Sequence, residues 1–210
     1  MPTKRRRPTP SAPADPLDRV IEAALGLAAR QGWRETTLAD IAAEANLGLA
    51  ELHRLVGSRT GILMAYSRRL DRAVLEGTPA ELADEGPRDR LFDVLMRRFE
   101  AMRPHREGLR AVARARTCEP QAALAVGCRM LAAMTWMLEA AGIATTGLKG
   151  RLRAKVLLAV YAAAMRAFLD DDSEDLARTM AALDKGLRRA EALEAFLARG
   201  RRAAPQAAAA

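Results

Sequence analysis

The stretch from residue 36 to residue 70 constrains the fold most, because it carries the signals of two short helices, a tight turn between them and a longer helix behind. Thr37 and Asp40 have the spacing of a capping box, which predicts a helix start. Asn46 follows where the chain must turn, and asparagine tolerates the left-handed backbone conformation that such a turn needs. Ser58 is suited to cap the third helix. Two short helices joined in this way form the unit that inserts its second helix into the major groove of DNA.

Apolar residues recur at helical spacing along this stretch and along the segment before it. A preceding helix is predicted to begin at Asp15–Pro16 and to end at Gly32, with Trp33 packed behind it. The second short helix is predicted to start near Leu49. The side chains expected to face inward in the helix-turn-helix and the helix behind it are Leu38, Ile41, Ala42, Ala45, Leu52, Leu55, Ile62, Tyr66 and Leu70.

Composition favours an all-α protein that has a polyanionic partner. Half of the 210 residues are hydrophobic but only 4% are aromatic, and alanine and leucine dominate, which favours helix over sheet. The formal net charge of +8 suits nucleic acid or an anionic surface, although many soluble proteins are simply basic.

Several other functional classes lack their sequence signals. Cys118 and Cys128 form no Cys-x-x-Cys motif, so we expect a reducing, cytoplasmic location without disulfides. The longest apolar run, residues 156–165, is about half of what a membrane span needs. The two histidines, His53 and His105, are far apart, and no phosphate-binding glycine loop, nucleophile elbow or metal-ligand motif appears. We therefore expect no enzyme, no cofactor and no metal.

Shifts in composition predict the domain organisation. Residues 1–14 are rich in proline and basic residues, and Gly77-Thr78-Pro79 interrupts the helical pattern. The basic tail has three interpretations: an arm that contacts DNA, a solubilising tail, or a transit peptide. The predicted units are a disordered tail (1–14), a helix-turn-helix DNA-binding domain (15–76, the head), a linker (77–87), a helical ligand-binding and dimerisation domain (88–199, the body) and a disordered tail (200–210).

Methionines and aromatic residues in the body indicate a possible site for a hydrophobic ligand. Methionine is adaptable and polarisable, so such a face can line a cavity, but methionines at helical spacing are also ordinary core. The candidate pocket residues are Phe99, Met130, Met134, Met137, Tyr161 and Met165. The last predicted helix carries a narrow apolar seam, at Leu176, Met180, Leu183 and Leu187, that suits packing on a neighbouring helix or on a second subunit.

The head resembles the amino-terminal domain of the TetR family of bacterial repressors over about residues 17–75. The residues that carry the resemblance are Ala23-Ala24, Gly32-Trp33, Ile41-Ala42-Ala43-Glu44-Ala45, Leu47, Leu52, Arg54, Ser58 and Ile62. The resemblance implies an all-α homodimer that binds double-stranded DNA and is released by a small hydrophobic effector. It implies phosphate contacts from Thr37, His53, Arg54 and Arg59, and places Gly48, Leu49, Ala50 and Glu51 on the helix that enters the major groove, near the base edges.

The carboxy half is similar to the TetR-fold lipid-binding proteins of ubiquinone biosynthesis, which act without DNA. This second resemblance rests on residues 104–107, 136–143, 160–161, 171–173 and 179–184. Glu51 and His53 also depart from the residues usual in the repressors. The alternative function is therefore that of a lipid-binding accessory protein with peripheral membrane contact.

Overall fold

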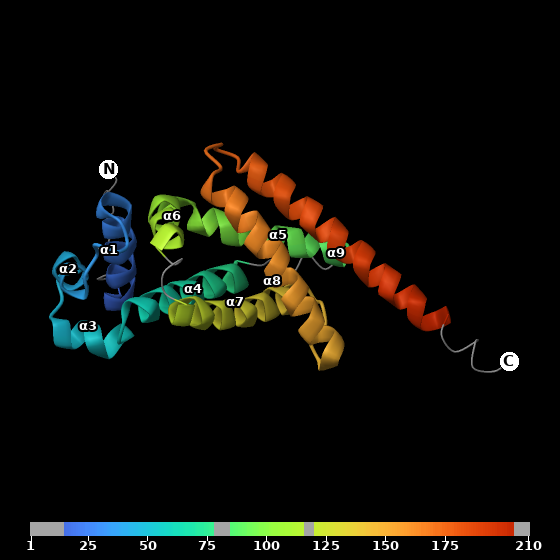
Figure 1. Cartoon of the computed structure of the whole chain (residues 1–210), viewed down its shortest axis with the longest axis horizontal. Coiled ribbons are helices and arrows are strands. Elements are labelled where there is room, and N and C mark those ends of the chain that lie inside the picture. Colours follow the sequence, from blue (N-terminus) through green and yellow to red (C-terminus); the bar gives the residue numbers. More distant parts are fainter. Residues whose placement is uncertain (1–14, 78–84, 116–119, 204–210) are drawn as a thin grey trace, which may run out of the picture.

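The computed structural model describes residues 15–77, 85–115 and 120–203, and these segments form helices and turns without a strand among them (Figure 1). The all-α prediction is therefore confirmed. The predictions for residues 1–14, for residues 78–84 of the linker, for Cys118 and for residues 204–210 lie outside the described ranges. The helices are α1 (Pro16–Gln31), α2 (Leu38–Glu44), α3 (Leu49–Val56), α4 (Arg59–Glu76), α5 (Pro87–Met102), η2 (Arg103–His105), α6 (Arg106–Ala115), α7 (Pro120–Ala140), α8 (Gly147–Leu169) and α9 (Ala177–Ala203).

Local signals in the sequence set the helix boundaries of the head. The Thr37 hydroxyl accepts a hydrogen bond from the backbone N–H of Asp40, and the Asp40 carboxylate accepts one from the N–H of Thr37. Asn46 has a φ of 54°, in the left-handed region, and turns the chain between α2 and α3. The Ser58 hydroxyl accepts from the N–H of Gly61 and so caps α4. Each of these features was predicted, and together they define the helix-turn-helix.

The core of the head lies between α1 and the inner faces of α2, α3 and α4. Ile21, Leu25, Ile41, Leu52 and Ile62 are almost completely buried there, and Trp33 closes the end of α1. Burial of each such side chain contributes about 1.5–3 kcal/mol to folding. The inward orientation predicted for Leu55 is wrong, since this side chain is 39% exposed. Val56, four residues after Leu52, packs against the core instead, and Leu55 lies at the edge of the buried face.

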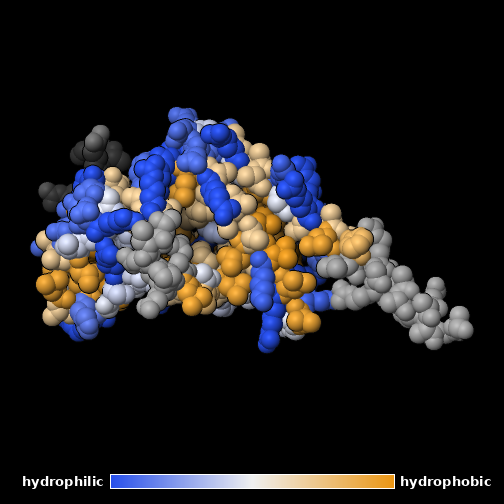
Figure 2. All heavy atoms as spheres, in the orientation of Figure 1, coloured by the Kyte–Doolittle hydropathy of each residue, from blue (hydrophilic) through white to orange (hydrophobic). Residues whose placement is uncertain are grey.

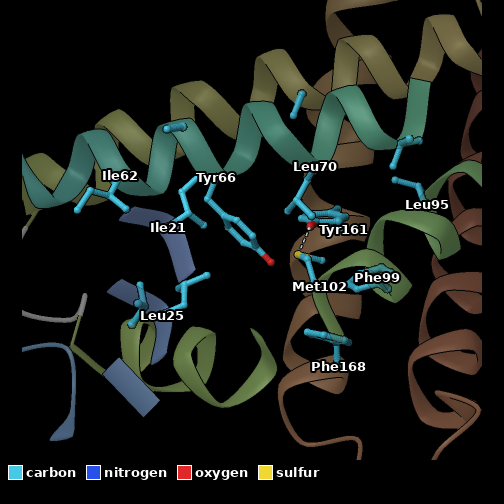
Figure 3. Close-up of a cluster of buried hydrophobic side chains, with 14 of the residues drawn as sticks. Ile21, Leu25, Ile62, Tyr66, Leu70, Leu95, Phe99, Met102, Tyr161 and Phe168 are labelled. Carbon is cyan, nitrogen blue, oxygen red and sulfur yellow. Dashed lines mark hydrogen bonds between the residues drawn. The ribbon is translucent and has the colours of Figure 1, made fainter. Parts of the chain in front are cut away.

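The body packs around the aromatic side chains of α5 and α8 (Figure 3). Phe99 stacks on Tyr161 at a centroid distance of 5.2 Å and contacts Phe168 at 5.4 Å. Met134 and Met137 of α7 are fully buried in the same cluster of side chains. The helix α4 runs from the head alongside α7, so one continuous helix belongs to both parts of the molecule (Figure 1).

The apolar seam of α9 packs within the same chain. Leu183 and Leu187 are buried against α8 and α5, and a Cβ at Gly186 would lie 2.6 Å from Val160, so α8 and α9 cross closely there. The helix starts later than predicted: Leu176 precedes it with a φ of 55°, and the Ser173 hydroxyl accepts from the N–H of Ala177. Within the described ranges, every helix is too short or too polar to cross a membrane.

Candidate nucleic-acid interface

The helix α3 lies at the outer edge of the head (Figure 1). Most of its side chains are exposed to solvent. Leu49 is 57% exposed, and Ala50, His53 and Arg54 are exposed as well. Glu51 is half-buried, and Leu52 anchors the helix in the core. A short helix that is anchored on one side and open on the other fits the dimensions of a DNA major groove.

Thr37 lies at the amino end of α2, where the capping bond occupies its hydroxyl oxygen as an acceptor. The hydroxyl has one proton, which it can donate either to the neighbouring Asp40 carboxylate or to an anion in front of the helix. Hydrogen bonds from the backbone and the side chain of Thr37 lower the pKa of Asp40. The Asp40 carboxylate therefore stays ionised at neutral pH and keeps the cap closed.

Arg59 has partners inside the head. Its guanidinium donates to the carbonyl oxygens of Trp33 at 2.9 Å and Thr36 at 3.1 Å, and it lies over the Trp33 ring at 5.5 Å. These bonds fasten the loop between α1 and α2 to the start of α4. They favour a structural role for this side chain, and the phosphate contact implied for it stays a prediction.

Charge is distributed unevenly between the head and the rest of the chain. From residue 15 to residue 76, nine acidic residues outnumber eight arginines. Some of these arginines are already paired within the head, such as Arg30 with Glu44 and Arg69 with Asp18. The excess of basic residues lies in residues 1–14 and in the body. The head alone therefore offers a polyanion little net electrostatic attraction.

A polar cluster joins the head to the body at η2. The His105 ring lies 3.2 Å from the Tyr66 hydroxyl through Nδ1 and 2.8 Å from the Glu22 carboxylate through Nε2. Arg69 pairs with the same carboxylate at 2.8 Å. Partial burial acts to raise the pKa of Glu22, but the hydrogen bonds from His105 and Arg69 outweigh it and lower this pKa. The ionised Glu22 thus holds α1, α4 and η2 together.

A second, buried cluster ties α4 to the body. Asp71 of α4 pairs with Arg98 of α5 and with Arg129 of α7. Arg98 is fully buried and also donates to Ser67 at 3.2 Å and to the Tyr161 hydroxyl at 3.3 Å. Burial lowers the pKa of Arg129, with a further contribution from Arg68. Sequence reasoning missed this cluster, because Arg98 is one of several charged residues of α5, next to Arg97, and the sequence does not mark it as the buried one.

The six residues predicted to line a ligand pocket lie within the packed body. Phe99, Met134, Met137 and Tyr161 are buried in contact with other core residues, and Met130 and Met165 are half-buried. A groove of about 330 Å³ exists elsewhere, between the ends of α5, α7, α8 and α9, and none of the six residues lines it. The structure thus favours the core-packing interpretation of the methionine-rich face. No cluster of metal-ligating side chains occurs in the ranges that the structure describes.

Comparison with known proteins relates the chain to solved structures alone: no protein-family model and no curated protein matches it. A TetR transcriptional regulator from Nitrosomonas europaea aligns with a TM-score of 0.70 at 22% identity, over 84% of this chain and 99% of that one. A TetR transcriptional regulator from Rhodococcus sp. RHA1 aligns with a TM-score of 0.56 at 19% identity, over 82% of this chain and 95% of its own.

A putative TetR-family transcriptional regulator from Rhodococcus sp. gives a TM-score of 0.55 at 17% identity, over 82% of this chain and 98% of that one. The chain is thus an all-α protein with a helix-turn-helix head and a helical body. Its fold is that of the TetR transcriptional regulators, as the resemblance of the head implied. These comparisons give no support to the resemblance with the lipid-binding proteins of ubiquinone biosynthesis.

Proposed function

We propose that this protein is a dimeric DNA-binding transcriptional regulator, a repressor that a small hydrophobic effector releases from its operator. The observation that carries the proposal is the helix α3, which a capping box, a left-handed Asn46 and a buried Leu52 hold in the geometry of a recognition helix, with its outer face open. The fold shared with TetR regulators adds to this support.

In the proposed complex, α3 enters the major groove. Some residues of the head contact phosphates, and others lie close to the base edges. Arg54 and His53 bind phosphates on one side of the groove, and the Thr37 hydroxyl binds a phosphate at the start of α2. Gly48 and Ala50 are small and exposed, so the helix can approach the base edges closely. Glu51 is repelled by phosphates, so its productive partner is the amino group of a cytosine.

The proposed dimer forms through the outer faces of α8 and α9. Small exposed side chains lie there, namely Ala159, Ala162 and Ala163 on α8 and Ala181 on α9. Small residues let helices approach closely, as in a four-helix bundle. A two-fold axis then places two α3 helices in successive major grooves, so the operator is a near-palindrome of two half-sites.

The proposed release of the operator depends on α4, which runs without a break from the head into the body. An effector that binds the body best in one arrangement shifts the population toward that arrangement, and the two heads then no longer match the half-site spacing. The contacts of Asp71 with α5 and α7 provide the mechanical connection between the body and α4.

The test is the replacement Arg54→Ala in the full-length chain, with Arg72→Ala as a matched control. Both arginines are exposed, but Arg72 lies near the end of α4 that reaches the body, away from α3 and from the proposed dimer helices. Binding to a genomic operator is measured by fluorescence anisotropy at several salt concentrations. Arg54→Ala should weaken binding and reduce the magnitude of the salt slope by about 1 for each phosphate that the side chain neutralises in the wild type. Arg72→Ala should match the wild type. Equal binding by all three proteins would contradict the proposal.

A further inference from the structure

The contact between α4 and α7 holds more positive charge than its own carboxylate can neutralise. Asp71 of α4 pairs there with Arg98 of α5 and with Arg129 of α7. The Arg98 side chain is fully buried, whereas that of Arg129 is 17% exposed. Arg68, three residues before Asp71, is exposed and forms no hydrogen bond or ion pair within the described part of the chain. One carboxylate balances one of these three guanidinium groups, so two positive charges remain.

Arg68 and Arg129 lie close enough to repel each other. Burial lowers the pKa of Arg129, and the nearby charge of Arg68 lowers it further. The Nε–H group of Arg129 is buried and has no hydrogen-bond partner among the described residues. A guanidinium group has five N–H donors, so the pairing with Asp71 leaves part of this capacity unused. The two arginines therefore offer both excess charge and spare donors at one place.

The helices that form this contact supply no second carboxylate near it. Arg129 is the only charged residue of α7 before Glu139, and the surface over α7 is largely hydrophobic on the face that Figure 2 shows. Glu139 lies ten residues beyond Arg129, about 15 Å along the helix, and accepts a hydrogen bond from Thr145. On α4, Glu76 lies eight residues beyond Arg68, about 12 Å along the helix. Neither carboxylate can neutralise the two arginines.

The neighbouring helices do not supply one either. The helix α8 packs on α7 and contains no acidic residue. On α5, Asp93 and Glu100 point away from the side that packs on α4, because each residue turns a helix by about 100°. The carboxylates of Asp18 and Glu22 on α1 pair with Arg69. Within the described ranges, the excess charge at the contact of α4 with α7 thus stays uncompensated.

We propose that Arg68 and Arg129 bind a dianionic phosphate group at the edge of the contact between α4 and α7. A phosphate monoester carries about −1.5 to −2 charges at neutral pH, which matches the two uncompensated charges. Its oxygens accept hydrogen bonds on several sides, so guanidinium groups from two different helices can bind it together. A carboxylate carries a single charge and would leave one arginine without a counter-charge. The inference goes beyond the proposed function, because the site does not require DNA.

Occupancy of this site has a route to the head. The anion competes with Asp71 for Arg129, so its binding weakens one of the two contacts that hold α4 to the body. The helices α4 and α7 lie side by side, and α4 continues into the head (Figure 1). Phosphate should therefore change the affinity for an operator by a measurable factor. This consequence alone rests on the proposed function.

Calorimetric titration of the full-length protein at constant ionic strength tests the proposal with four probes. Inorganic phosphate and glycerol 3-phosphate carry two charges at pH 8, whereas dimethyl phosphate and acetate carry one. The first two should bind at least about tenfold more tightly than the last two, since a charged hydrogen bond contributes about 1.5 kcal/mol or more. Tighter binding of glycerol 3-phosphate than of inorganic phosphate identifies a phosphorylated metabolite as the ligand, and the reverse order identifies free phosphate. Equal binding of all four probes, or of none, would overturn the proposal.

Three variants locate the binding site. Arg68→Gln should weaken phosphate binding by about two- to fivefold, as expected for an exposed ion pair, and Arg129→Gln by about tenfold. Arg72→Gln is the matched control, because Arg72 is exposed on the same helix but its charge does not act on Arg129. It should bind phosphate as the wild type does. Equal losses in Arg68→Gln and Arg72→Gln would show only general attraction by a basic protein and would overturn the proposal.

Thermal unfolding in chloride buffer without phosphate adds a measurement that does not depend on a ligand. Arg68→Gln should unfold at a higher temperature than the wild type, because it removes the repulsion of Arg129 and the two residue types have similar helix propensities. Added phosphate should raise the unfolding temperature of the wild type more than that of Arg68→Gln. A lower unfolding temperature of Arg68→Gln in chloride would show that Arg68 has a stabilising partner, and the proposal would fail.

The proposal and the regulator function can fail separately. Phosphate binding that Arg68→Gln weakens supports the site even where the protein selects no operator, and then only the regulator function fails. If Arg54→Gln abolishes phosphate binding and Arg68→Gln does not, the anion binds at the proposed DNA face and the site is overturned. If no probe binds and Arg68→Gln dissociates the dimer in sedimentation, a carboxylate of a second copy occupies the contact and the proposal is likewise overturned.

Discussion

Asp71 connects the helix α4, which continues into the head, to two helices of the body. It is a nearly buried carboxylate on α4, and it receives two guanidinium groups from two different helices. Burying these charges costs several kcal/mol each, and their mutual attraction offsets that cost only while every partner is present. The cluster thus fixes one arrangement of α4, α5 and α7, and removing one member should have a large effect.

Asp71→Asn should lower the free energy of unfolding by about 3 to 5 kcal/mol, because it leaves the buried Arg98 without a counter-charge. Urea denaturation followed by circular dichroism measures this change. The control is the double replacement Asp71→Leu with Arg98→Met, which removes the two most deeply buried of the three charges and should recover part of the loss. A stability of Asp71→Asn equal to that of the wild type would show that the cluster does not hold α4.

Asp171 should make the stability of the protein depend on pH in the acid range. Burial acts to raise the pKa of this carboxyl, but hydrogen bonds from Ser173 and Thr179 outweigh it and lower the pKa to about 2. The contribution to stability is complete above the unfolded pKa of about 4 and is lost as the pH falls toward 2. Denaturation at a series of pH values should show this decline, and Asp171→Asn should flatten it. The same slope in both proteins would contradict the assignment.

At the scale of whole elements, the close crossing of α1 and α6 sets how the head sits on the body. Gly108 lies on α6 at the crossing, and a Cβ there would come within 2.4 Å of the backbone oxygen of Leu25. The two helices therefore pack backbone to backbone at this point. The His105 and Glu22 contact lies at the same junction.

Gly108→Ala should destabilise the protein by about 1 to 3 kcal/mol, because the added methyl group forces α1 and α6 apart. Gly127→Ala is the matched control: this glycine is also within a helix, but an added Cβ meets nothing within 4 Å. It should stabilise the protein by about 0.5 to 1 kcal/mol through helix propensity. Thermal unfolding of both variants measures the difference, and equal shifts would show that the crossing tolerates the methyl group.

The elements also show how far the sequence determines this structure. The boundaries of α2, α3 and α4 were predictable, since Thr37, Asn46 and Ser58 act on residues close to them in the chain. The bonds of Arg59 and Arg98 were not predictable, because they depend on which helices meet in space. The groove was missed for the same reason: its lining comes from four helices, and the methionines predicted to line a pocket belong to the core.

At the scale of the whole molecule, the distribution of charge between the head and the rest of the chain bears on how tightly the protein should bind DNA of any sequence. The head carries one more acidic than basic residue between positions 15 and 76, whereas Lys4-Arg5-Arg6-Arg7 precedes it. Weak attraction by the head means that sequence-blind binding should be modest at physiological salt, because that binding comes mostly from phosphate contacts. Specific binding then depends on two heads held at the spacing of two half-sites.

The most direct test of this account is the selection of genomic DNA fragments by the purified full-length protein, followed by a salt titration on the best fragment. The protein should select a near-palindromic site and bind it at least about a thousandfold more tightly than scrambled DNA. Protection of its two half-sites should be centred about one helical turn apart or at a multiple of that distance. Weak, salt-sensitive binding that does not distinguish sequences would contradict the claim that this protein is a transcriptional regulator.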